Sequence, residues 1–398
     1  MKETLKLNNT VWLVPLEPFP GRYTEQWYRN IPTVFEEFGF ACSVIDGITL
    51  TNTIDVGSFL PMNSTVHYKS TQMQNIAGLF QTNIIKDGDS FFIYDLEFWG
   101  IEAIRLMAQM NKINVKIFAF LHAASYTNED AFAIAAPYQK YTEVGWIAMC
   151  DKVFVGSEYH KQAIIERRLK LYADPAELQK LSNKIIVTGN PVFGNEYPTF
   201  QNVVKKNQLI ISNRFDWEKR PNVSLDFVVI LKEKHPDWNF VLTTGNPTLK
   251  SNKKWLIDYA RTLEKLDILH IAENCTKDEY HRHLAESKVM LTNSIEENFG
   301  YCIIEACIYN TSPLAPWKLS HPELLNGNHF LLYEDEDEII EKVEVLMKTP
   351  IKTDVYVKKY LKSMYNIMNE IRGEKYPPQT SVASTYSPAP IMLLNQGY

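Results

Sequence analysis

Two glutamates, Glu297 and Glu305, stand eight residues apart in the stretch NSIEENFGYCIIEA, residues 293–306. Residues 288–292 are typical of a strand, and Phe299–Gly300 is typical of a turn into a helix. Backbone N–H groups at a helix start attract phosphate, and a glycine there lets the backbone approach a ligand closely. Glu305 would follow in the first turns of that helix, where a carboxylate can accept hydrogen bonds from sugar hydroxyls. A surface glutamate favoured by the helix dipole explains this position equally well.

Alternating strands and helices are expected to position these groups. Short apolar runs predict strands at residues 11–16, 41–45, 90–94, 114–121, 151–155, 184–188, 208–212, 239–243, 269–272, 288–292 and 312–315. Helical patterns cover residues 24–38, 101–110, 224–234, 254–266, 277–287, 300–309, 335–347 and 354–372. This alternation predicts an α/β fold of parallel sheets covered by helices on both faces. Ligands of such sheets bind beyond the carboxyl ends of the strands.

Length and composition limit the number of domains and the class of protein. The 398 residues favour two domains, and 45% hydrophobic with 22% charged residues is ordinary for a soluble globular protein. A polar segment at 194–202 divides two doubly wound halves, 1–195 and 205–350. These are expected to face each other across a cleft. A helix at 351–374 is expected to pack back toward the first half, and 375–398 is expected to be a tail.

The sequence favours a cytoplasmic protein. Five scattered cysteines without a C-x-x-C pair indicate a reducing compartment and no zinc cluster. No signal peptide and no apolar run long enough for a transmembrane segment is found. The net charge of −6 does not indicate a nucleic-acid binder, although a local basic groove can lie on an acidic protein.

The stretch from Glu297 to Glu305 resembles the E-x7-E signature of retaining nucleotide-sugar glycosyltransferases of the B-type fold, which has two Rossmann-like domains. The inner Phe-Gly and the Glu-Ala that follows match as well. The resemblance implies that Glu297 lies against the donor sugar. The turn Asn298–Phe299–Gly300 would bind the phosphates, and Glu305 the ribose.

A second motif, Arg214-x4-Lys219, follows the expected strand at 208–212 and resembles the pair that neutralises the donor diphosphate in this family. Two such cations stabilise the charge that develops as the glycosidic bond breaks. A solvated pair of loop charges is the less favoured alternative. The sequence departs from the family pattern at Asn213 and Arg220, where glycine is usual. Gly245, in Thr-Thr-Gly-Asn, resembles the turn near the nucleotide.

The first half holds the candidate acceptor site. His122, after the strand at 114–121, resembles the family's histidine near the donor sugar, although a lone histidine is more often structural. The first loop and helix contribute Arg22, Tyr23 and Gln26. Arginine and aromatic side chains there can stack on a planar acceptor, or pack in the core. Asp95 and Glu97, after the strand at 90–94, can orient an acceptor hydroxyl.

The opening Pro-Leu-Glu-Pro…Arg-Tyr-Thr-x-Gln-Trp also resembles glycosyltransferase-like proteins of tailed phages. Some phage enzymes of this broad kind glycosylate hydroxymethylated pyrimidines in DNA, so modified DNA is the favoured acceptor. Basic residues between Lys161 and Lys184 can contact a DNA backbone or form a solvated helix face. The resemblance implies a nucleotide-diphosphate sugar as donor and no required cofactor or metal. Transfer to a cell-envelope polysaccharide or glycolipid, a nucleotide-sugar epimerase or hydrolase, and a non-catalytic nucleotide- or DNA-binding protein remain alternatives.

Overall fold

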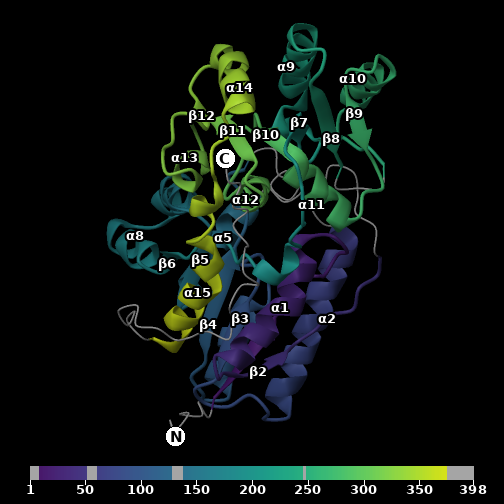
Figure 1. The fold of residues 1–398 in the computed structure, drawn as a ribbon. Helices are drawn as coiled ribbons and strands as arrows, with labels where there is room; N and C mark the ends of the chain where they lie inside the picture. Colours follow the sequence, from purple (N-terminus) through teal and green to yellow (C-terminus); the bar gives the residue numbers. More distant parts are fainter. Residues whose placement is uncertain (1–8, 52–60, 128–137, 245–247, 374–398) are drawn as a thin grey trace, which may run out of the picture. The chain divides into compact units, whose positions relative to one another are not determined.

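The computed structural model describes residues 9–51, 61–127, 138–244 and 248–373 (Figure 1). The chain forms two compact units. Within the described residues, the first unit contains the chain up to Pro191 together with Ser363–Gly373, and the second contains Val192–Lys362. Each unit has its own six-stranded parallel sheet and its own helices, and each is described separately.

The sheet of the first unit has the strand order β2-β1-β3-β4-β5-β6, and every neighbouring pair is parallel. Its strands are β1 (Thr10–Val14), β2 (Ala41–Val44), β3 (Ser90–Ile93), β4 (Lys116–Leu121), β5 (Lys152–Val155) and β6 (Ile185–Val187). The inner strands β3, β4 and β5 are almost wholly buried, as continuous apolar runs such as Ser-Phe-Phe-Ile require. The order reverses between β1 and β3, which defines the switch point of this sheet.

The described helices of the first unit lie between its strands, except for α15, which follows the second unit in the chain. They are α1 (Tyr23–Glu37), α2 (Met62–Gln81), α3 (Ile101–Met110), α5 (Gln139–Met149), α6 (Glu158–Ile164), α7 (Lys170–Tyr172), α8 (Pro175–Ser182) and α15 (Ser363–Arg372). A single π-helical turn, η1 (Ile165–Leu169), joins α6 to α7. Local sequence fixes several of the helix ends. Asp174, for example, accepts hydrogen bonds from the first free N–H groups of α8, and Pro175 follows at a position where no N–H is needed.

The sheet of the second unit has the order β12-β11-β10-β7-β8-β9, again entirely parallel. Its strands are β7 (Lys206–Ile211), β8 (Asn239–Thr243), β9 (His270–Ala272), β10 (Ser287–Leu291), β11 (Ser312–Pro316) and β12 (Leu332–Tyr333). This is the order of a dinucleotide-binding sheet, with its switch point between β7 and β10. The predicted α/β class with two doubly wound parallel sheets is therefore confirmed.

The helices of the second unit are α9 (Pro221–Lys234), α10 (Lys254–Lys265), α11 (Lys277–Glu286), α12 (Tyr301–Ile308), α13 (His321–Leu324) and α14 (Ile339–Lys348). Short 3-10 turns are η2 (Gly194–Glu196), η3 (Trp217–Lys219), η4 (Glu336–Glu338), η5 (Asp354–Tyr356) and η6 (Tyr360–Lys362). Buried apolar side chains of β7, β10, α9 and α12 meet in one core. Figure 1 shows these helices arranged around the sheet.

Two details of the sequence prediction were wrong. The last strand is β12 and not the one at 312–315, because a pair as short as Leu332–Tyr333 gives no recognisable pattern. The single helix expected at 354–372 is two 3-10 turns followed by α15. The change of conformation coincides with the passage of the chain from one unit to the other: Tyr356, Val357 and Tyr360 belong to the core of the second unit, whereas residues from Ser363 onward belong to the first.

Candidate active site

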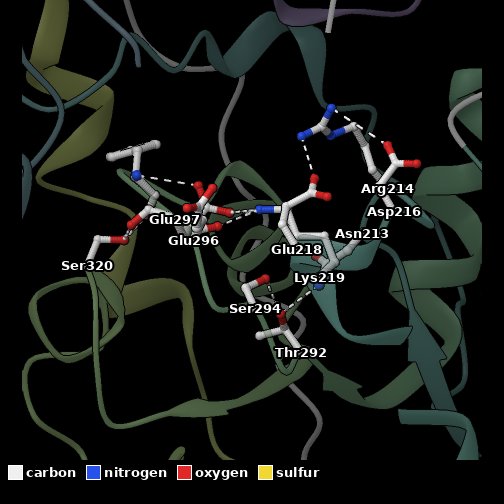
Figure 2. A network of polar contacts seen from close by, with 11 residues as sticks. Asn213, Arg214, Asp216, Glu218, Lys219, Thr292, Ser294, Glu296, Glu297 and Ser320 are labelled. Carbon is white, nitrogen blue, oxygen red and sulfur yellow. Dashed lines mark hydrogen bonds and ion pairs between the residues drawn. The ribbon is translucent and has the colours of Figure 1, made fainter. Parts of the chain in front are cut away.

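The motif residues of the second unit lie at the switch point of its sheet. β7 ends at Ile211, and Arg214 and Lys219 follow in the loop and the turn η3. β10 ends at Leu291, and Glu297 follows in the next loop. Asn213 joins the two loops, because its amide donates to the Thr292 hydroxyl at 2.6 Å (Figure 2). The sheet therefore brings together two motifs that stand about 80 residues apart along the chain.

Lys219 and Glu297 form the central ion pair of this site. The ammonium group lies 3.0 Å from Glu297 Oε2 and also donates to the backbone carbonyl of Glu296 at 2.8 Å. Ser320, in the loop after β11, donates to the carbonyl groups of Glu297 and Phe299 at 3.3 and 2.8 Å. Both main chain and side chain of the loop are thus held, so that the carboxylate has a defined position (Figure 2).

Arg214 is held by two carboxylates of its own loop. Its guanidinium donates to Glu218 Oε1 at 2.6 Å and lies 3.8 Å from Asp216 Oδ2. The Glu218 side chain is buried, and its backbone carbonyl accepts the N–H of Ile295 at 2.9 Å, which ties η3 to the Glu297 loop. The Arg214 side chain is one-third exposed, so a ligand can reach it.

The turn before α12 has the backbone geometry that its glycine predicts. Gly300 has φ +101°, and an added Cβ would lie 3.0 Å from Leu324 Cδ1. The neighbouring Phe299 is buried, packs edge-on against Tyr301 and Tyr360, and directs its N–H toward Glu297 Oε1 at 3.4 Å. Asn298, which precedes Phe299 in the chain, is half-buried.

Glu305 lies on α12, and Tyr280 on α11 holds it. The Tyr280 hydroxyl donates to Glu305 Oε2 at 2.7 Å. Burial raises the pKa of the Glu305 carboxyl, although the hydrogen bond from Tyr280 and the charge of Lys277 partly offset the effect. The residue is therefore not a freely solvated position on an amphipathic helix.

Burial and neighbouring charges act on the other carboxylates in opposite directions. Burial alone would raise the pKa of Glu297. The charge and hydrogen bond of Lys219 and the N–H of Phe299 instead lower this pKa below its usual value, so the group is ionised at neutral pH. Burial raises the pKa of Glu218 despite its ion pair with Arg214. His321, next to this cluster, has its pKa lowered to about 4 by burial and is neutral.

His122 in the first unit lies in an aromatic cage. Its ring packs against Tyr23, Trp27 and Phe120, with centroids 5.2, 4.7 and 4.9 Å away, and Nε2 lies 2.7 Å from the Tyr94 carbonyl oxygen. Burial lowers its pKa, so the ring is neutral at pH 7. A neutral ring whose Nε2–H donates to that carbonyl is firmly oriented.

The other acceptor candidates lie near the carboxyl ends of β1 and β3. Asp95 forms an ion pair with the buried Lys69 of α2 at 2.8 Å, and the same ammonium donates to the Glu97 carbonyl. Asp95 therefore stabilises the contact between its loop and α2, and it is also a candidate acceptor-binding residue. Gln26 is buried in α1, and Arg22 precedes that helix as its N-cap.

Several predicted residues are not brought into these clusters. Gly245 lies outside the described residues. Of the basic residues between Lys161 and Lys184, Arg168 pairs with Glu143 and Lys170 with Glu166, and Lys184 donates to carbonyl groups. Across the described residues, no group of three or more His, Cys, Asp or Glu side chains has the arrangement of a metal site.

The sequence interpretation missed Glu218, Ser320, Tyr280 and Lys69. Glu218 had a usable signal, since it stands four residues after Arg214 and opposite charges at this spacing often pair. The other three contact the site only through the tertiary fold, and their neighbours in sequence carry no motif.

Comparison with known families finds a match in the second half of the chain. Residues 196–364 match the family model described as "Glycosyl transferases group 1". This segment, less than half of the chain, is therefore similar to glycosyltransferases of that family. The match contains both motifs, Arg214-x4-Lys219 and Glu297-x7-Glu305, and supports the resemblance of this segment to glycosyltransferases.

Solved glycosyltransferase structures share the fold over nearly the whole chain. Sucrose-phosphate synthase from Thermosynechococcus elongatus superposes with a TM-score of 0.61, at 11% identity, over 92% of this chain and 98% of that one. The catalytic domain of starch synthase IV from Arabidopsis thaliana, bound to ADP and acarbose, gives 0.60 at 12% identity, with 92% and 98% covered. HepE from Anabaena, in complex with UDP and glucose, gives 0.56 at 13% identity, with the same coverage. At these identities the likeness establishes the two-domain fold.

None of the described helices is long and apolar enough to cross a membrane.

Proposed function

We propose that the chain is a glycosyltransferase that moves a sugar from a nucleotide-diphosphate sugar to a hydroxyl acceptor, with retention of configuration. The observation that carries this proposal is the Lys219–Glu297 pair at 3.0 Å, next to Arg214, at the switch point of the second sheet. A parallel sheet binds its ligand at this point, and the two cations suit a diphosphate. The second unit, with 205–350, would bind the donor, and the first, with 1–195, the acceptor.

The residues would divide the work as follows. Amides of the Phe299–Gly300 turn and the side chains of Arg214 and Lys219 bind the diphosphate. As the bond between the anomeric carbon and the phosphate oxygen breaks, its electron pair passes to that oxygen, where both cations stabilise the charge. The acceptor oxygen bonds to the anomeric carbon from the face that the phosphate leaves, and its proton passes to the departing phosphate. Glu297 orients the sugar, and Glu305 accepts hydrogen bonds from the ribose.

The proposed donor class agrees with two structures of similar fold, whose descriptions state UDP with glucose and ADP with acarbose. Binding of the diphosphate through Arg214, Lys219 and backbone amides would need no metal ion. All five cysteines are free thiols, which suits action in a reducing cytoplasm.

The proposed acceptor is a hydroxymethylated pyrimidine in DNA. The half-buried rings of the neutral His122 and of Tyr23 lie 5.2 Å apart at an interplanar angle of 35° and form an aromatic surface near the carboxyl ends of β1, β3 and β4. Such a surface suits a planar base that has left the helical stack. Arg22 and Gln26 would hold the base, and Asp95 with Glu97 would orient the hydroxyl. This acceptor assignment also rests on the likeness of the opening segment to phage proteins.

A donor screen and an acceptor screen test the proposal in turn. UDP- and ADP-sugars, UDP-glucose included, are first compared by thermal shift, since the ligand that binds raises the melting temperature. The donor found is then incubated with DNA containing hydroxymethylcytosine or hydroxymethyluracil, and with polysaccharide and lipid acceptors. Sugar transfer to modified DNA in the presence of EDTA is expected. Transfer only to polysaccharide or lipid would overturn the DNA assignment, and isomerisation or rapid hydrolysis of the donor would overturn transferase activity.

A further inference from the structure

Three exposed tyrosines gather on the first unit. Among the described residues, the strongly exposed aromatic side chains are Tyr138, Tyr141, Tyr172, Trp255 and Phe330, at 66, 60, 40, 48 and 64%. Tyr138 is the N-cap of α5, and Tyr141 stands three residues later on the same helix face. The ring of Tyr172, at the end of α7, lies 5.4 Å from that of Tyr141. We call Tyr138, Tyr141 and Tyr172 the tyrosine patch.

One cation lies at this patch, and a second lies on η1, the turn that leads directly to α7 and Tyr172. The ammonium group of Lys140 lies 5.1 Å from the centre of the Tyr141 ring. On η1, the exposed Arg167 places its guanidinium 5.3 Å from the ring of the buried Tyr126. Solvent-exposed rings next to cations are the features with which proteins bind unpaired nucleic-acid strands: bases stack on the rings, and the cations contact phosphates.

A buried network fixes the patch to the loop after β4. Glu143 on α5 is only 2% exposed, and Arg168 of η1 lies 3.5 Å from its carboxylate. Ser125 completes the network. Its N–H and hydroxyl donate to the two Glu143 oxygens at 2.5 and 2.7 Å, and its hydroxyl accepts from Arg168 Nε at 2.7 Å. Ser125 stands three residues after His122, so the patch and the His122 loop share one rigid support.

The backbone conformation of η1 is itself unusual. Single π-helical turns are rare and occur often at functional sites, because the wider turn redirects the side chains that follow. Here η1 carries both Arg167 and Arg168, and α7 with Tyr172 follows it directly. The turn thus supplies one cation to the surface and one to the buried network.

We propose that the tyrosine patch, with Lys140 and Arg167, binds an unpaired stretch of a nucleic-acid strand and holds it beside the loop that carries His122. The inference rests on the proposed function in taking this strand as the acceptor, since a base must leave the stack before its hydroxymethyl group can react. The Lys140 ammonium group on the Tyr141 ring and the exposed Arg167 on η1 favour a polyanion over a neutral glycan. A helix that inserts into a lipid surface has a continuous apolar face, whereas the patch carries tyrosine hydroxyl groups and charged side chains.

The test is fluorescence anisotropy with a labelled single-stranded oligonucleotide of about 12 nucleotides, a site size typical of such surfaces. Wild-type protein is expected to bind it, and Tyr141→Ala with Tyr172→Ala to weaken binding about tenfold or more, as lost stacking does. Tyr141→Phe keeps the ring and should retain binding. Arg167→Gln should lower the slope of log affinity against log salt by about 0.7. Trp255→Ala and Phe330→Ala, which remove exposed rings of the second unit, are the matched controls.

Each other outcome has a stated meaning. The proposal fails if the oligonucleotide does not bind, if the double tyrosine variant binds like wild type, or if the controls weaken binding equally. It also fails if neutral dextran or phosphatidylserine vesicles bind through the patch and the oligonucleotide does not. Donor turnover without patch-dependent oligonucleotide binding would reject this inference and leave the transferase standing. Patch-dependent binding without turnover of any nucleotide sugar would reject the proposed function instead.

Discussion

At the scale of single residues, the account depends on Lys219 and Glu297. The pair is partly shielded from solvent, with 12 and 19% of the two side chains exposed, so its electrostatic attraction is stronger than that of a surface pair. A donor diphosphate would compete with Glu297 for the ammonium group. In the proposed function the carboxylate would therefore weaken binding of the phosphates while it orients the sugar, and the effect on phosphate affinity can be measured.

We expect Glu297→Gln to lower sugar transfer by about 10²–10³-fold, the usual effect of removing one preorganised polar group. The affinity for the nucleoside diphosphate alone should stay the same or rise, because the variant removes a negative charge next to Lys219. Single-turnover transfer and calorimetric titration with UDP or ADP measure the two quantities. A large loss of diphosphate affinity would show that Glu297 acts on the phosphates and not on the sugar.

Tyr280→Phe tests the role of Glu305 without altering the carboxylate. The variant keeps the partly buried ring but removes the hydroxyl that donates to Glu305 Oε2. Because the buried carboxylate then lacks one donor, we expect a loss of about 1–2 kcal/mol in the free energy of unfolding. Nucleotide affinity should fall several-fold, whereas the affinity for inorganic pyrophosphate should not change. Equal losses for both ligands would argue against ribose recognition by Glu305.

At the scale of elements, the sequence predicted the strand ends well, but it did not predict the distant residues that hold the site residues in place. Strong apolar runs such as Asn239–Thr243 matched the observed strand, because a buried parallel strand tolerates few other patterns. The departure noted at Arg220 has a structural reason. This residue adopts the left-handed conformation with φ +45°, which explains why glycine is usual there, and it pairs with Glu336 on η4. The local sequence around Arg220 does not predict its pairing with Glu336, which lies 116 residues away.

Gly300→Ala tests the turn that begins α12. At φ +101° an alanine is strained, and its Cβ would meet Leu324 Cδ1 at 3.0 Å. We expect a loss of about 1–3 kcal/mol in unfolding free energy and weaker diphosphate binding, since the amides of the turn move. Gly78→Ala is the control. It lies exposed within α2, has no neighbouring atom within 4 Å of an added Cβ, and should be neutral or slightly stabilising. Denaturant titration compares the two, and a neutral Gly300→Ala would contradict the assigned turn.

At the scale of the whole molecule, both units bury neutral histidines. Burial lowers the pKa of His160 in the first unit, and of His281 in the second, to about 3. The unfolded chain takes up a proton near pH 6.5, whereas the folded chain does so only near pH 3. Between these values the unfolded state binds more protons, so the stability of each unit decreases as the pH falls.

The acid sensitivity can be assigned to one residue. His281 is fully buried among the rings of Tyr197, Tyr280 and Tyr309. We expect His281 to account for about 2 kcal/mol of the stability lost between pH 7 and pH 5. His281→Phe should remove that part of the loss, and His270→Phe, at an exposed position, should not. Urea titrations at the two pH values provide the comparison, and an unchanged loss in His281→Phe would refute the assignment.

The same scale shows what sequence alone conveys about function. The spacing of Glu297 and Glu305 and of Arg214 and Lys219 was sufficient to indicate the family whose model matches residues 196–364. The tyrosine patch has no such signature. Its members come from α5 and α7, about 30 residues apart, and only the fold and the buried Glu143–Arg168 pair bring them together.

The most direct test of the central claim is the affinity for UDP and ADP, measured by calorimetry in wild type, Arg214→Met, Lys219→Met and Lys206→Met. Lys206 pairs with Glu286 at 2.6 Å at the opposite end of β7 and serves as the matched control. We predict that wild type binds at least one of the two nucleotides. Arg214→Met and Lys219→Met should each weaken that binding at least tenfold, and Lys206→Met should leave it unchanged. Affinities that stay the same in Arg214→Met and Lys219→Met would contradict a donor site at the switch point of the second sheet.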